Sequence, residues 1–393
     1  MRGTRNGAFQ LKNAPNVYPY LPDEEDNNEM FTTLWGKWEE VGNLLFKKDD
    51  INMNIIASQL PDSNPPLVFP ESVIRMFVLI TEEYRHVVRD VIDISHGRKN
   101  TSQISFPPQV DDNVDIEPPL KKVKLADVEN TFNPFFLDDE ETVDGTVILA
   151  GQCGIGKSTF LYFVVILRIL AGLPTILELN DGSLLAFTSE GFFRIDHLHH
   201  LGERRDVVLP SSHLFPRYFP PGTWYCFDST STSTQIRSPC CGKFADFFFL
   251  QTASSDEAKW KESVQGSAAS LSLYYMQPPS VCEILIASTY QRKVSKIEDI
   301  YNRILIAGPC PQRVYHFDST SLKKKINERF SQTTFKDFSI ISSSYEKSGS
   351  MPELLLKRPY NDRSECIVTF TSRFVHDLVL RRFMVGTRDG FMI

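Results

Sequence analysis

The sequence predicts an α/β fold with three layers, in which a mostly parallel sheet lies between helices. Between residues 144 and 315, short apolar runs rich in β-branched residues alternate with helical patterns, as in successive βαβ units. The first run, residues 146–150, leads through a glycine-rich turn into a helix expected over residues 160–170. Hydrophobic residues make up 41% of the chain and charged residues 23%, which is ordinary for a globular protein.

The glycine-rich turn matches the pattern G-x-x-x-x-G-K-[ST] at every fixed position, from Gly151 to Ser158. Glycine permits backbone angles and close approaches that a Cβ atom would obstruct. The freed N–H groups and the positive end of the following helix then face a phosphate. We expect Lys157 to lie against the β- and γ-phosphates of a nucleotide and Ser158 to ligate Mg²⁺. The residues predicted to bind the nucleotide in this loop are Gly151, Gly154, Ile155, Gly156, Lys157, Ser158 and Thr159. The alternative is a glycine-rich turn that matches by chance.

Further strands and helices follow the loop. Gly172 is expected to end the first helix. Strands are then predicted over residues 175–179, 184–188, 192–195, 224–227, 247–252 and 271–275. Two helices are predicted to begin with capping boxes, at Ser280 with Glu283 and at Ser295 with Glu298, and Gly308 is expected to end the second.

A second half of the nucleotide site is predicted at Asp228. Four apolar residues precede this aspartate, as in the Walker B strand that holds the metal opposite the loop. Lys157 and Asp228 are therefore the candidate catalytic residues, and Ser158 and Asp228 the candidate metal ligands. The alternative is an aspartate that begins a turn. Many ATPases carry a glutamate after this aspartate, which polarises the attacking water, but here Ser229 occupies that position. The absence of the glutamate favours a protein that hydrolyses ATP slowly and acts as a conformational switch.

Polar residues at other strand and helix ends are secondary candidates. Thr252 or Ser254 would lie near the γ-phosphate at the end of the 247–252 strand, or would simply cap that strand. Arg313 would reach the phosphates from a helical lid, although an exposed arginine is the commoner outcome. The chain lacks the Asn-Lys-x-Asp motif of guanine-specific proteins, which favours ATP.

Composition divides the rest of the chain. Residues 1–96 are expected to be mainly helical, with helices over residues 30–45 and 71–94. Residues 97–143 form an acidic, proline-containing linker that carries a basic cluster, defined as Lys121, Lys122 and Lys124. This cluster resembles a nuclear import signal, or it is a set of solvated lysines. Residues 316–393 form a C-terminal region of unknown role.

Charge and cysteine content indicate which partners and which cellular compartment to expect. The net charge is −7, and residues 111–144 hold eleven acids against three lysines. Residues 321–393 hold thirteen basic residues against eight acids, which permits weak contact with nucleic acid. Seven cysteines in no metal-binding pattern favour an intracellular protein with reduced thiols. We expect no signal peptide and no membrane span.

The ordered motifs resemble a fungal P-loop NTPase family associated with Crinkler effectors and retrotransposon hot spot (RHS) proteins. They are Gly151-Gln-Cys-Gly-Ile-Gly-Lys-Ser158, Leu161-Tyr-Phe163, Gly172-Leu-Pro-Thr-Ile176, Trp224-Tyr-Cys-Phe-Asp-Ser229, Thr252-Ala-Ser-Ser255, Tyr274-Tyr-Met276 and Gly308-Pro-Cys-Pro311. The resemblance covers under half of the chain. It implies an AAA/STAND-like ATPase domain over residues 144–315 with a helical lid, and action in the nucleus. The chain departs from the family at Cys153, where the family tends to have proline.

These observations together predict an ATP-binding protein with slow, Mg²⁺-dependent ATPase activity that acts as a conformational switch with an unknown protein partner. Two alternatives stay open. One is a non-hydrolytic nucleotide-binding or protein-interaction module, which Ser229 favours. The other is a small-molecule kinase, which would need a substrate pocket that the sequence does not reveal.

Overall fold

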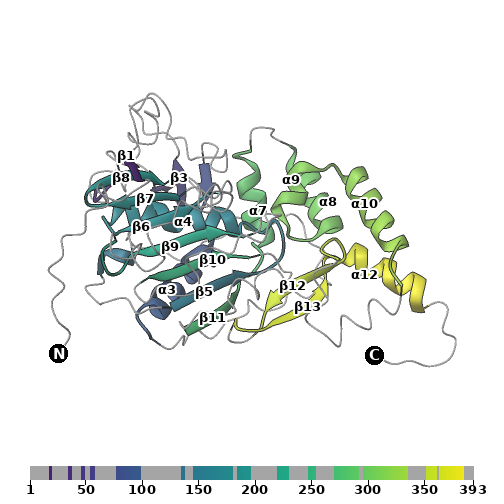
Figure 1. Cartoon of the computed structure of the whole chain (residues 1–393). Helices are drawn as coiled ribbons and strands as arrows, with labels where there is room; N and C mark the ends of the chain where they lie inside the picture. Colours follow the sequence, from purple (N-terminus) through teal and green to yellow (C-terminus); the bar gives the residue numbers. More distant parts are fainter. Residues whose placement is uncertain are drawn as a thin grey trace.

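The computed structural model describes residues 17–19, 34–37, 46–48, 54–57, 77–98, 134–137, 145–179, 184–195, 219–229, 247–253, 270–291, 295–334, 351–360 and 363–384. Figure 1 shows these residues as a large sheet with helices α3 and α4, beside a group of helices and a small hairpin. The linker expected over residues 97–143, with its basic cluster, lies outside the described residues apart from residues 97–98 and the 3₁₀-helix η3 (Pro134–Leu137).

The large sheet has eight strands in the order β1-β8-β7-β6-β9-β10-β5-β11. The strands are β1 (Val17–Pro19), β5 (Gly145–Ala150), β6 (Thr175–Glu178), β7 (Leu184–Thr188), β8 (Gly191–Ile195), β9 (Trp224–Asp228), β10 (Phe248–Thr252) and β11 (Ser270–Tyr275). The strands from β6 to β11 in this order pair in parallel, whereas β1, β8 and β7 add an antiparallel edge. The protein is therefore an α/β protein with a mixed, mostly parallel sheet.

The seven strands from β5 to β11 confirm the strands predicted between residues 146 and 275. Strand β5 is buried along its whole length, as expected for a parallel strand covered on both faces. Because side chains alternate along a strand, Val147 and Leu149 join one core cluster while Ile148 joins another. Short apolar runs bounded by turn residues were thus sufficient to locate the strands.

Helices α3 (Glu82–Ser95) and α4 (Lys157–Leu170) share one core cluster with the sheet. Twelve of the 14 residues of α4 are buried, so this helix is apolar on nearly every side. Gly172, with φ of 68°, follows its end as predicted. The opposite face of the sheet carries a second, aromatic-rich cluster. Within the described residues, α3 and α4 both pack in the first cluster, on one face of the sheet. Neither helix contributes to the cluster on the opposite face, so the second helical layer of the expected three stays a prediction.

The N-terminal region differs from the mainly helical region that the sequence predicts. Strands β2 (Phe46–Lys48), β3 (Asn54–Ala57) and β4 (Phe77–Leu79) form a small antiparallel sheet, and β1 pairs with β8. The helix expected over residues 71–94 begins only at Glu82, because the Thr81 side chain caps it by accepting from the Tyr84 N–H at 3.2 Å. Of the helix expected over residues 30–45, the structure describes residues 34–37.

Four helices follow the sheet: α7 (Val281–Ser288), α8 (Ile297–Ala307), α9 (Pro311–His316) and α10 (Ser319–Ser331). The capping box of Ser280 and Glu283 is confirmed at the start of α7. The second predicted box is wrong: Lys296 is the N-cap of α8, and no side-chain hydrogen bond caps this helix. Gly308, with φ of 75°, ends α8 as predicted.

The C-terminal region packs against these helices. It contains the hairpin β12 (Leu355–Pro359) and β13 (Cys366–Phe370), helix α12 (Arg373–Val379) and the π-helix η6 (Leu380–Met384). One core cluster joins Ile306 of α8, Phe330 of α10, Leu355 of β12 and Val375 of α12. The boundary expected between residues 315 and 316 therefore runs through a shared core. Across the described ranges, no helix is long and apolar enough to cross a bilayer.

Candidate functional site

The glycine-rich loop connects the end of β5 to the start of α4, as the sequence predicts. Gly151, Gly154 and Gly156 have φ of 146°, 80° and 106°, values that residues with a Cβ atom rarely adopt. Gly156 is the N-cap of α4 and has no side chain with which to occupy the free N–H groups of the first turn. Ile155 anchors the loop because its side chain is buried in the core beneath it. The backbone conformation is thus one that can face an anion.

Lys157, the first residue of α4, lies folded back across the loop. Its Nζ donates to the carbonyl oxygens of Gly151 at 3.0 Å and of Gln152 at 2.8 Å. These two bonds use two of the three donors of the ammonium group. Burial, at 4% exposure, lowers the pKa of Lys157 to about 8, against the opposing effect of Cys153, Asp228 and Cys310. Because the net effect on the Lys157 pKa is a decrease even with Asp228 nearby, an anionic ligand would compensate further for the buried charge.

Asp228 ends β9 at the same edge of the sheet. Strand β10 lies between β9 and β5, and Thr252 of β10 pairs in register with Asp228 on one side and Leu149 on the other. The Thr252 hydroxyl donates to Asp228 Oδ1 at 2.8 Å. Asp228 is near enough to Lys157 to favour its charged form. The structure therefore brings the two predicted catalytic residues to one edge of the sheet, where Thr252 ends the strand between β5 and β9.

The residues that would hold Mg²⁺ are Ser158, in the first turn of α4, and Asp228. Among the described residues there is no group of three or more His, Cys, Asp or Glu side chains arranged for a metal ion. That finding is compatible with Mg²⁺, which proteins hold through one or two side chains together with substrate phosphates and water. The glycine backbone, the buried ammonium and the hard oxygen donors fit a magnesium nucleotide.

Ser229 follows Asp228 and is bonded within the sheet. Its hydroxyl donates to the Thr252 carbonyl oxygen at 2.8 Å and accepts from the Gln251 amide at 3.0 Å. Gln251 is buried, and its Oε1 has no hydrogen-bond partner in the described part of the chain. The residue after Asp228 therefore supplies a hydroxyl that is held in place, and no carboxylate.

Tyr84 of α3 holds the loop from one side, a role that sequence reasoning missed. Its hydroxyl donates to the Gly156 carbonyl oxygen at 2.7 Å and interacts with the Thr159 side chain. Burial raises the pKa of Tyr84 well above its usual range, so this hydroxyl stays a donor. A Cβ atom on Gly156 would overlap the Tyr84 hydroxyl. Gly156 is thus required both by its φ and by this contact.

Gln152 ties the loop to the C-terminal hairpin. Its Nε2 donates to the carbonyl oxygens of Pro352 at 2.8 Å and Leu355 at 3.0 Å, and its Oε1 accepts from the Lys357 N–H at 3.3 Å. About 200 residues of chain separate these groups, so no local pattern predicts the contact.

Arg313 was predicted to reach the phosphates from a helical lid, and this stays a prediction. Its guanidinium donates to the Pro352 carbonyl oxygen at 2.6 Å, the same oxygen that Gln152 uses. The first turn of α9 nevertheless lies on the loop, because the Gln312 N–H donates to the Gly154 carbonyl oxygen at 3.3 Å. The helix that carries Arg313 is therefore at the site, but its neighbour Gln312 makes the contact with the loop.

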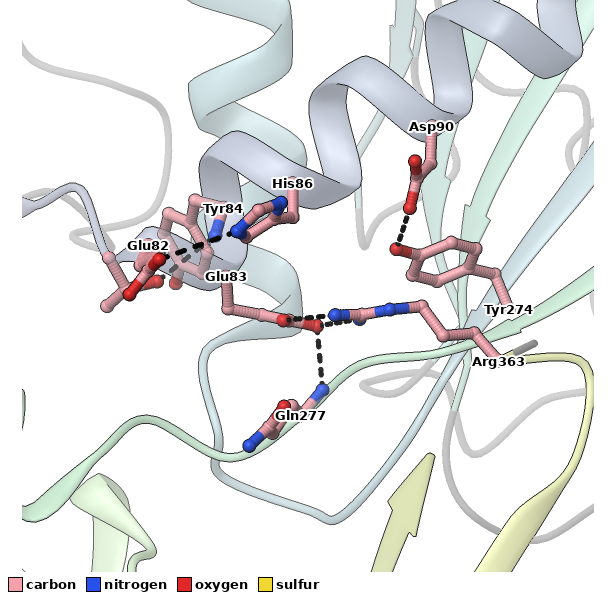
Figure 2. A network of polar contacts seen from close by, with 9 residues as sticks. Glu82, Glu83, Tyr84, His86, Asp90, Tyr274, Gln277 and Arg363 are labelled. Atoms are coloured by element: carbon pink, nitrogen blue, oxygen red, sulfur yellow. Dashed lines mark hydrogen bonds and ion pairs between the residues drawn. The ribbon is translucent and has the colours of Figure 1, made fainter. Parts of the chain in front are cut away.

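Figure 2 shows a second set of polar contacts, which joins α3 to the end of β11 and to the β12–β13 hairpin. The Glu83 carboxylate receives two bonds from Arg363, at 2.5 and 2.9 Å, and one from the Gln277 N–H at 2.7 Å. Asp90 accepts from the Tyr274 hydroxyl at 2.5 Å. Glu83 and Arg363 are both buried. Because Glu83 and Tyr84 are adjacent, α3 contacts the loop and the hairpin from a single turn.

Two comparisons with known proteins were negative. No protein-family model matches the chain, and no curated protein matches it.

Proposed function

We propose that this chain is an ATP-binding P-loop protein whose slow, Mg²⁺-dependent hydrolysis of ATP acts as a conformational switch. The backbone from Gly151 to Thr159 would surround the phosphates, and Lys157 would neutralise their charge. Ser158 would ligate Mg²⁺ directly and Asp228 through water. The nucleotide supplies the phosphoanhydride bond, and Mg²⁺ supplies the charge that stabilises the leaving oxygen.

One observation carries this proposal: a buried lysine is held across a left-handed glycine loop with Asp228 nearby. Burying an ammonium group is unfavourable unless an opposite charge compensates for it. In the described part of the chain, Lys157 Nζ donates to two carbonyl oxygens, which orient the charge, and the nearby Asp228 carboxylate does not offset the cost of its burial. A triphosphate with its metal would provide that compensation, which is why the geometry favours such a ligand over a neutral one.

The sheet order supports the AAA/STAND-like form of the P-loop fold that the sequence led us to expect. In this form a strand lies between the loop strand and the strand of the metal-side aspartate. Strand β10 occupies that position. Thr252 at its end, bonded to Asp228, would then lie near the γ-phosphate, one of the two positions proposed from the sequence.

The surroundings of Ser229 support slow rather than fast turnover. A general base must accept a proton from the attacking water, and a hydroxyl bonded to Thr252 and Gln251 is a poor acceptor for it. The same observation favours a second candidate, a nucleotide-binding module that does not hydrolyse. For the small-molecule kinase that the sequence left open, no contact of the described residues adds support.

Calorimetry and phosphate release test the proposal on the full chain. Wild-type protein should bind ATP with Mg²⁺ and release phosphate slowly. Lys157→Ala should weaken binding by about tenfold to a hundredfold, because it removes a charge-assisted contact. Asp228→Ala should reduce phosphate release more than binding. Lys324→Ala, on the exposed face of α10, is the matched control.

The outcomes separate the two candidates. Binding without phosphate release selects the non-hydrolytic module. The absence of any heat of binding from folded protein would exclude both. Kinship with Crinkler- and RHS-associated proteins is a proposal that rests on the motifs, and action in the nucleus is one that rests also on the basic cluster. We further propose that the switch acts on a protein partner. Contact with nucleic acid would fall to the basic C-terminal region.

A further inference from the structure

Two cysteines lie on either side of the contact between the loop and α9. Cys153 is an exposed residue of the loop, and Cys310 is the buried N-cap residue of α9. The Cys310 thiol donates to the Cys153 carbonyl oxygen at 3.3 Å, and Cys153 Sγ lies 3.9 Å from Gln312 Oε1. Each cysteine therefore contacts the segment that carries the other.

The contact is tightly packed. A Cβ atom on Gly154, the residue after Cys153, would lie 2.6 Å from Gln312 Oε1 and 3.0 Å from Cys310 Sγ. The backbone bond from Gln312 to Gly154 adds to this packing. The main chain of Cys153 therefore touches the Cys310 thiol, and the Cys153 thiol touches the residue two positions after Cys310.

The exposure of the two thiols suits their oxidation in sequence. Lys157 interacts with both cysteines, and its charge opposes part of the rise that burial causes in the pKa of Cys310. Cys153 is exposed and so is accessible to a small oxidant. Cys310 is buried, and burial raises its pKa, which suits a thiol that reacts second, after its partner has been oxidised.

We propose that Cys153 and Cys310 are a redox-sensitive pair that forms a reversible disulfide when the protein meets a peroxide. The bond would fix α9 to the loop and so slow the exchange of nucleotide. The inference rests on the proposed nucleotide site and names its regulation. Residue 153 is also where the chain departs from the family that its motifs resemble.

The chemistry balances with hydrogen peroxide as the oxidant. The Cys153 thiolate attacks one oxygen, the O–O bond breaks, and hydroxide leaves and takes up a proton to become water. The resulting sulfenic acid is then attacked by the Cys310 sulfur. The S–S bond forms, the S–O bond breaks, and a second water leaves with the Cys310 proton. Two thiols are oxidised, and one peroxide is reduced to two waters.

The other described cysteines provide controls. Cys226 and Cys366 are buried within the sheet and the hairpin, and burial raises the pKa of Cys226 to about 12. Cys282 of α7 is half-buried, and its pKa is raised by burial and by the adjacent Glu283 carboxylate. Cys282→Ser is therefore the matched variant, because it removes a partly accessible thiol that lies outside the loop.

Peptide mapping of the full chain decides whether the bond forms. Reduced protein is treated with hydrogen peroxide, digested without reductant and analysed by mass spectrometry. The expected product is a peptide pair joined through Cys153 and Cys310, two hydrogens lighter than its parts and lost on adding a thiol reductant. It should persist in Cys282→Ser and be absent from Cys153→Ser and Cys310→Ser. Oxidation of Cys153 to sulfinic acid with no joined pair would overturn the proposal.

Release of a fluorescent ATP analogue then tests the consequence. Peroxide should slow release by at least about tenfold in wild type and in Cys282→Ser, with recovery on reduction and no effect in the two loop-contact variants. An unchanged release rate in protein that carries the joined pair would overturn the regulatory part. If reduced protein binds no nucleotide, the proposed function fails, whereas the mapping result still decides whether the disulfide exists.

Discussion

Replacement of Lys157 by methionine tests whether the loop holds a confined charge. Methionine keeps an unbranched chain of similar volume but removes the ammonium group. Burial lowers the pKa of Lys157 from 10.5 to about 8, so the unfolded chain binds this proton more tightly than the folded protein does. At pH 7, below both values, the folded state therefore bears the full penalty, about 3 kcal/mol. The penalty disappears as the pH rises through the window from about 8 to 10.5.

The assay is urea unfolding of both proteins without nucleotide, at about pH 7 and about pH 9.5. Between these pH values, wild type should gain about 2 kcal/mol of unfolding free energy relative to Lys157→Met. Comparison at each pH cancels the titration of every other group that the two proteins share. The variant also loses the bonds to Gly151 and Gln152, about 1 kcal/mol each, which adds a constant offset.

A difference in unfolding free energy that is the same at both pH values would refute the reasoning. It would mean that the ammonium group of Lys157 is solvated in the folded protein. The loop would then not need an anion to compensate for a buried charge. Lys324→Met, at an exposed site on α10, controls for the loss of one positive charge.

Three further predictions concern packing, the buried ion pair and location. Gly308→Ala should destabilise the protein by at least about 3 kcal/mol in thermal unfolding, because its Cβ would overlap the Thr371 carbonyl oxygen; Gly172→Ala, also at positive φ but with its nearest neighbour at 3.5 Å, should cost only about 1 kcal/mol. Arg363→Met should lower the free energy of unfolding by about 3 kcal/mol or more, because it leaves the buried Glu83 carboxylate without its partner. Adding Glu83→Gln should restore part of that loss, and strictly additive effects of the two substitutions would contradict a coupled pair. A fluorescent fusion with neutral residues in the basic cluster should leave the nucleus, and an unchanged distribution would exclude the import signal.

The strands and the loop were predictable because their determinants are local. Apolar runs bounded by glycine or turn residues located β5 to β11, and one motif located the turn before α4, although this helix begins at Lys157 rather than at the expected residue 160. Asp228 was found because four apolar residues precede it in a strand whose end must lie at the same edge as the loop. These inferences need only the sequence within about ten residues and the geometry of parallel sheets.

Contacts between distant segments were not predictable in this way. Tyr84 bonds to Gly156, which lies 72 residues later in the chain, and Glu83 pairs with Arg363, which lies 280 residues later. The bond from Arg313 to the carbonyl oxygen of Pro352, about 40 residues later, is a further contact that no local pattern indicates. The capping box at Ser295 failed for a local reason, since α8 begins one residue later than the pattern requires and Lys296 takes the N-cap position.

The bonds of Gln152 bear on how the protein can be divided for experiment. A fragment cut at residue 315 would retain every motif residue yet remove Pro352, Leu355 and Lys357, leaving the Gln152 amide without the three main-chain partners that it has in the intact chain. Failure of such a fragment to bind nucleotide would reflect the missing hairpin and would carry no information about Lys157 or Asp228. The smallest unit suitable for biochemical study therefore extends at least through β13.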